Sequence, residues 1–168
     1  YATPQSFDLG VLITPFSPLT IDGTEVAFEF SGVPPVGLAI NPATGEITGT
    51  PTALFGAQDV QVHAFNLEGD AYFDVNMEVL DVAPANLTYT TPQNFNENIL
   101  ITPFTPLTAD GTNLVYSAPG LPTGLAIDPN TGEISGTPTT LFSTNNVAVT
   151  ITNPQGVDAF NISITVLA

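Results

Sequence analysis

The stretch VPPVGLAINPATGEITGTPTALF, residues 33–55, recurs as LPTGLAIDPNTGEISGTPTTLF at residues 121–142. The two copies are 87 residues apart, counted from Pro51 to Pro138. In each copy, apolar residues alternate with small ones, then a turn with proline and glycine follows, and an isoleucine begins the return. Each copy therefore predicts two short strands joined by a tight turn, and proline ends the second strand because it has no N–H to donate.

The turn residues of the first copy have separate physical roles. Pro42 fixes φ near −65°, the Asn41 side chain can accept hydrogen bonds from the turn backbone, and Gly45 can take a positive φ. Gly37 and Gly124 precede the first strand of each pair, which predicts a tight backbone entry there. This stretch therefore helps to predict the fold and says little about function.

The repetition extends over most of the chain. Residues 3–16 recur as residues 91–104, and both copies end in a strand whose alternate residues are apolar. The residues predicted to face inward in these last strands are Phe73, Val75, Met77 and Val79, and Phe160, Ile162, Ile164 and Val166. About seven short strands with one apolar face each predict a two-sheet sandwich. The predicted fold is all-β, with two tandem Ig-like or cadherin-like sandwich domains at residues 1–82 and 83–168.

The linker and the chain start lead to two further expectations. Residues 81–86 contain Pro84, so we expect the connection to bend little. Tyr1 aligns with Tyr89, and we therefore expect the chain to be a segment of a longer array or a processed product.

The chain is strongly acidic, with no Lys or Arg, 16 Asp and Glu, and a net charge of −16. Nothing in the chain can neutralise phosphates, which argues against nucleic acid and anionic membranes as partners. Cysteine is absent, and no apolar run is long enough for a membrane helix.

The second copy, GLPTGLAIDPNTGEISGTPTT, followed by Asn153-Pro154-Gln155-Gly156 and a closing strand from Phe160, resembles the putative-Ig repeat family. That family is related to the dystroglycan-type cadherin-like domains. The first copy is similar apart from an insertion at Pro34-Pro35. The resemblance implies Ig-like modules of the kind found in tandem in large bacterial and archaeal surface proteins and adhesins.

Catalytic arrangements are poorly supported, and we predict no enzyme and no catalytic residues. His63 is predicted to point outward on a strand without a partner, which indicates a surface histidine. Asp22 and Asp110 lie in matched Asp-Gly-Thr loops, a faint likeness to the paired carboxylates of aspartic proteases. The residue order differs and the domains are small, so turn chemistry explains both copies.

Calcium is the one candidate cofactor, because it prefers carboxylate and amide oxygens near loops and domain junctions. The candidate interdomain ligands are Asp81, Asn86, Glu68, Asp70 and Glu97. Asp128 and Glu133 flank the second corner, whose first-copy equivalents are Asn41 and Glu46. The other interpretation is that all of these are solvated turn residues.

Two N-glycosylation patterns are present, at Asn86 and at Asn161. Asn161 is predicted to face outward by strand alternation.

The sequence favours an extracellular structural or adhesive module, secreted or at the cell surface: a stalk, filament unit or adhesin segment acting as a stiff spacer. Its expected partners are neighbouring repeats or copies of itself, with glycans or cell-surface proteins as further candidates. The alternative is an accessory module that binds carbohydrate or protein, which predicts an aromatic platform in one domain. An acid hydrolase is the third hypothesis, and it predicts a dependence on Asp22 or Asp110.

Overall fold

The computed structural model describes residues 1–168, and the chain divides into unit 1, Tyr1–Asp81, and unit 2, Val82–Ala168. Every regular element is a β-strand. The structure therefore contains no helix that is long and apolar enough to cross a membrane. Each unit encloses its own hydrophobic core. The all-β fold with tandem Ig-like sandwiches is therefore confirmed.

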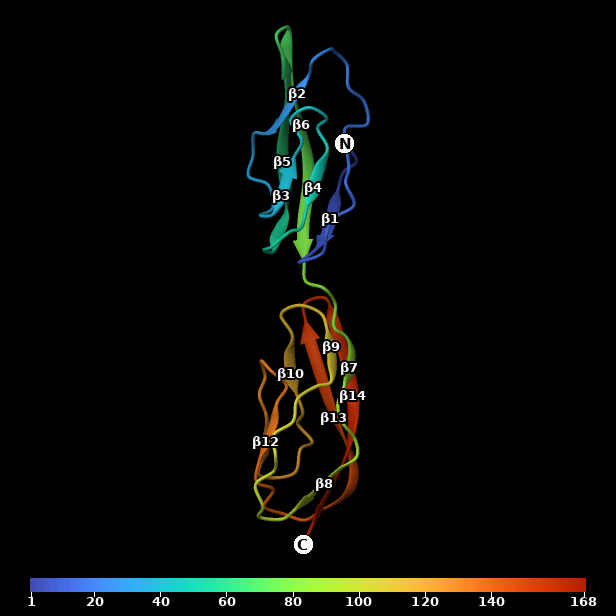
Figure 1. Cartoon of the computed structure of the whole chain (residues 1–168), viewed down its shortest axis with the longest axis vertical. Helices are drawn as coiled ribbons and strands as arrows, with labels where there is room; N and C mark the ends of the chain where they lie inside the picture. Colours follow the sequence, from blue (N-terminus) through green and yellow to red (C-terminus); the bar gives the residue numbers. More distant parts are fainter. The chain divides into compact units, whose positions relative to one another are not determined.

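In unit 1, one sheet contains four strands in the order β1-β6-β5-β2 (Figure 1). The long hairpin of β5 and β6 forms its centre, and β1 pairs with β6 in parallel at the edge. The second layer contains the hairpin of β3 and β4. The bounds are β1 Gln5–Asp8, β2 Ala27–Phe30, β3 Leu38–Ile40, β4 Ile47–Gly49, β5 Phe55–Asn66 and β6 Gly69–Leu80.

Unit 2 repeats this plan with the order β10-β13-β14-β8, and with the hairpin of β11 and β12 in its second layer. It also contains β7, which pairs antiparallel with β9. The bounds are β7 Ala85–Thr88, β8 Gln93–Asn96, β9 Thr108–Asp110, β10 Val115–Ser117, β11 Leu125–Ile127, β12 Ile134–Gly136, β13 Phe142–Asn153 and β14 Gly156–Leu167. Unit 1 has no equivalent of the β7–β9 pair.

The repeated stretch forms the predicted corner in both units. The Asn41 Oδ1 atom accepts hydrogen bonds from the Ala43 and Thr44 N–H groups, and Gly45 has φ of 71°. At Gly124, φ is 93°, and an added Cβ would lie 1.9 Å from the Thr137 carbonyl oxygen. Glycine is therefore required there both by the backbone conformation and by the space.

The two cores use matched residues from both layers. Val60, Val62, Val75 and Met77 of unit 1 are almost fully buried. Their equivalents in unit 2 are also buried: Val147, Val149, Ile162 and Ile164. The alternation of the long strands therefore predicted the inner face correctly, with one exception. Phe73 was expected inside but is 44% exposed, because it borders an open groove.

The start of unit 2 is fixed by hydrogen bonds to its own loops. The Val82 N–H donates to the Thr112 Oγ1 atom at 2.8 Å, and the Asn153 side-chain amide donates to the Val82 and Thr112 carbonyls at 2.7 and 2.8 Å. Val82 thus belongs structurally to the second unit.

Candidate functional site

The candidate calcium ligands of unit 1 lie at opposite ends of one strand. Glu68 is in the turn between β5 and β6, Asp70 is near the start of β6, and Asp81 follows its last residue. A strand rises about 3.3 Å per residue, so Asp70 and Asp81 are separated by roughly 35 Å along β6. The fold therefore does not bring Asp81 together with Glu68 and Asp70.

The remaining two candidates are separated in unit 2. Asn86 lies in β7, and the Leu87 N–H beside it bonds to Asp158 near the start of β14. Glu97 donates its N–H to the Leu167 carbonyl at the other end of β14. No group of three or more acidic or histidine side chains forms a metal-binding cluster. Calcium binding stays a prediction, which melting curves with calcium and with a chelator would test.

At the second corner, Asp128 has the same structural role as Asn41 in the first. Its Oδ1 atom accepts hydrogen bonds from the Asn130 and Thr131 N–H groups at 2.7 and 3.1 Å. These backbone bonds, that of Asn130 first, lower the pKa of the Asp128 carboxyl. The carboxylate is thus used to close the turn.

The two Asp-Gly-Thr loops belong to different units. Asp110 accepts a 2.7 Å hydrogen bond from the Asn86 side chain, which connects the loop to β7. The Thr24 carbonyl in the matching loop of unit 1 accepts from the Asn66 side chain. Both loops are therefore held to neighbouring elements of their own unit, as the turn interpretation expects.

The expectation that His63 has no partner is wrong. Its Nδ1 atom lies 3.0 Å from the Glu29 Oε1 atom, and its Nε2 atom lies 3.4 Å from the Asp70 Oδ2 atom. The side chain does point outward, but it is only 16% exposed. The pKa of His63 is raised, first by its hydrogen bond to Glu29 and also by Asp70.

His63 also forms an aromatic column with its neighbours on the outer face of the sheet. The His63 ring stacks on Tyr72 with ring centroids 4.5 Å apart, and on Phe65 with centroids 4.8 Å apart. Phe65 and Tyr72 are exposed. The positions of unit 2 that match His63, Tyr72 and Phe65 are Thr150, Ala159 and Thr152. Unit 2 therefore has no equivalent aromatic column.

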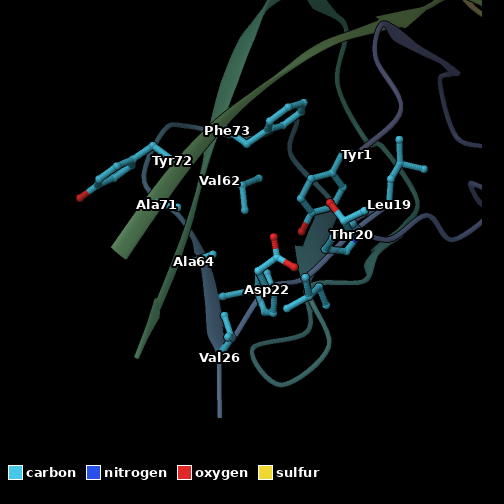
Figure 2. Close-up of a pocket in the computed structure, with 13 residues that line it drawn as sticks. Tyr1, Leu19, Thr20, Asp22, Val26, Val62, Ala64, Ala71, Tyr72 and Phe73 are labelled. Atoms are coloured by element: carbon cyan, nitrogen blue, oxygen red, sulfur yellow. The ribbon is translucent and has the colours of Figure 1, made fainter. Parts of the chain in front are cut away.

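Unit 1 contains a groove of about 410 Å³ beside the loop that follows Pro18. Figure 2 shows Leu19, Thr20 and Asp22 from this loop near Val62 and Ala64, which form part of the opposite wall. The Tyr72 ring points away from the groove in the same view, toward the outer face. The sequence alone did not reveal this groove.

The two glycosylation candidates differ in their surroundings. Asn86 is exposed but its side-chain nitrogen is bonded to Asp110, and its φ is 54°. Asn161 is exposed on β14 opposite Ala148. Modification at both positions stays a prediction.

A family model described as a putative Ig domain matches residues 78–167, which is more than half of the chain. A similar curated protein is the serine-rich adhesin for platelets of Staphylococcus aureus, strain USA300. It is 27% identical over 155 residues and covers 90% of this chain but 7% of its own length. The corresponding protein of strain MRSA252 is also 27% identical, over 11% of its length. The chain thus spans a small part of these relatives.

Among solved structures, a three-domain fragment of titin immunoglobulin domains has a TM-score of 0.50. It covers 99% of this chain and 63% of its own, at 12% sequence identity. At this identity the likeness shows the fold alone.

Proposed function

Because the chain belongs to the putative Ig domain family, we propose that it is an extracellular structural and adhesive repeat module that acts as a stiff spacer. Its similarity to a bacterial adhesin for platelets supports a place on the cell surface. The absence of Lys and Arg supports an extracellular role as well, since trypsin-like proteases cleave after those residues.

The observation that carries this proposal is the short connection between two self-contained cores. β6 ends at Leu80, and Val82 is already hydrogen-bonded within unit 2. One residue, Asp81, separates them, and it is buried. Few backbone dihedral angles are left to vary, which favours limited bending. The buried Pro84 has a fixed φ and also restricts the backbone of Ala83 before it.

Surface display tests the spacer function. One, two or four copies of the chain would be placed between a cell-surface anchor and an epitope, and the epitope height would be measured by fluorescence interferometry. A stiff spacer raises the epitope in equal steps for each copy. A Gly-Ser linker of the same length is the control, and its height should grow with the square root of its length. Square-root growth for the chain itself would contradict the proposal.

A second candidate function is carbohydrate binding at the aromatic column of Phe65, His63 and Tyr72. This column gives unit 1 the aromatic surface that a binding module requires. Glu29 and Asp70 lie beside it and can accept hydrogen bonds from sugar hydroxyls. Glycan-array binding that is lost in Tyr72→Ala and retained in Leu67→Ala would support it. Equal binding by both variants would reject it.

A further inference from the structure

The outer faces of the two large sheets differ, although the cores behind them match. On the sheet of unit 1, the outward positions of β2, β5 and β6 include five acidic residues: Glu29, Asp59, Asp70, Asp74 and Glu78. The matching positions of unit 2 hold uncharged residues: Ser117, Asn146, Val157, Asn161 and Thr165. The carboxylates and the aromatic column therefore occur together, on the outer face of unit 1.

Two of these carboxylates flank the aromatic column. Glu29 lies opposite His63 on β2, and Asp70 lies opposite Phe65 on β6. Each directs one oxygen toward an imidazole nitrogen, at 3.0 Å for Glu29 and at 3.4 Å for Asp70. Both side chains are 57% exposed, and a carboxylate has a second oxygen that can accept hydrogen bonds. A ligand can therefore bond to both carboxylates without displacing His63.

Phe65 and Tyr72 supply the apolar part of this surface. Both rings are exposed, and the Tyr72 ring extends toward the outer face with its hydroxyl at the tip (Figure 2). The face of an aromatic ring carries partial negative charge, so it attracts polarised C–H groups and cations. The surface thus combines ring faces with carboxylates, which suits a ligand that has both C–H groups and positive charge.

The charge of this face decides between classes of glycan. Even when His63 is protonated, it balances only one of its two neighbouring carboxylates. Asp74 adds a third carboxylate nearby, where it accepts a 3.2 Å hydrogen bond from the Gln61 side chain. The chain has no Lys or Arg to offset them. Sialylated or sulfated glycans are therefore repelled within a Debye length of about 10 Å, and cationic glycans are attracted.

We propose that the aromatic column of unit 1 binds carbohydrates that carry protonated amino groups. This inference rests on the carbohydrate-binding candidate described above and names the class of its ligand. The Phe65 and Tyr72 rings contact the C–H groups of an amino sugar such as glucosamine. The Glu29 and Asp70 carboxylates accept hydrogen bonds from its ammonium group.

Two tetrasaccharides that differ in the amino group alone test this inference. The ligands are the linear tetramer of glucosamine and its fully N-acetylated form, and calorimetric titration of the whole chain gives each dissociation constant. The titration is run at about pH 6, where primary amines are protonated. We expect the glucosamine tetramer to bind at least about tenfold more tightly, because charge-assisted hydrogen bonds are roughly twice as strong as neutral ones. Added salt should reduce this preference.

Matched variants locate the preference on the molecule. Glu29→Gln combined with Asp70→Asn removes both carboxylates beside the column, and the ratio of the two dissociation constants should fall toward one. Glu97→Gln combined with Glu133→Gln is the control, because it removes the same number of charges from unit 2. This control should keep the ratio of the unaltered chain. The comparison of the two ligands on the unaltered chain needs no variant to fold.

Four results would overturn the inference. Equal affinity for the two tetramers would show that the amino group is not recognised, and carbohydrate binding would still stand. A preference that persists without Glu29 and Asp70 would show attraction by the overall charge of the chain. A lysine tetramer that binds as tightly as the glucosamine tetramer would indicate a site for basic peptides. Binding of neither tetrasaccharide would also reject the inference, and the glycan array would then decide the carbohydrate candidate separately.

Discussion

The side-chain amide of Asn86 donates a 2.7 Å hydrogen bond to the Asp110 carboxylate. This bond engages the nitrogen to which an N-linked glycan would be attached. Asn161 presents its side chain on the exposed face of β14.

We therefore predict that the folded chain is glycosylated faster at Asn161 than at Asn86. The measurement is glycopeptide mass spectrometry after treatment with an N-glycosylating enzyme. Chain denatured in urea is the control, in which the two sites should react at similar rates. Faster reaction at Asn86 in the folded chain would contradict this prediction.

Replacement of the buried Leu87 should destabilise unit 2. Leu87→Ala removes a side chain that is 3% exposed, and a buried leucine truncated to alanine typically loses about 2–5 kcal/mol. We expect a lower denaturation midpoint for unit 2 and an unchanged one for unit 1. Leu67→Ala is the matched control, because Leu67 is 99% exposed. A similar effect for the two variants would show that β7 does not complete the core.

Gly124 is expected to tolerate no side chain. In Gly124→Ala the new Cβ would meet the Thr137 carbonyl oxygen at a residue with φ of 93°. Backbone strain of this kind costs about 1–3 kcal/mol, and the clash adds to it. Chemical denaturation of this variant and of Gly156→Ala provides the comparison, since the nearest atom to a Cβ at Gly156 is 3.9 Å away. Equal unfolding free energies would contradict the corner geometry.

The stability of unit 1 should depend on pH through His63. Its folded-state pKa is raised by Glu29 and Asp70, so protonated His63 stabilises the folded state. This contribution is fully present below the unfolded pKa of about 6.5 and is lost as pH rises through the higher folded value. The melting temperature of unit 1 should therefore fall over that range, and His63→Gln should remove the dependence. If the melting temperature of unit 1 still falls over this pH range in His63→Gln, another group causes the dependence.

The corner and the inner faces of the long strands could be predicted because local chemistry determines them. Asn41, Gly45 and Gly124 act within a few residues, and alternation alone distinguishes Val62 from His63. The partners of His63 could not be predicted, because Glu29 is 34 residues away and reaches it only through the register of β2 and β5.

The groove of unit 1 could not be predicted from the sequence for a related reason. Phe73 has the pattern of a core residue, and its equivalent Phe160 packs on the core of unit 2. Phe73 is exposed because it lines the groove, and the pattern of a strand does not show which other elements cover its side chains. The separation of two candidate calcium ligands could not be predicted for a similar reason, since the 12-residue length of β6 lies between Asp70 and Asp81.

The stiffness of the linker is the central claim, and the distance between two spin labels tests it most directly. The chain has no cysteine, so Ala57→Cys and Ala148→Cys place one label on an exposed strand position of each unit. Double electron–electron resonance should give one narrow distance distribution. Asn153→Ala, which removes the bonds to Val82 and Thr112, should broaden it. A broad distribution in the chain with Asn153 intact would contradict the account.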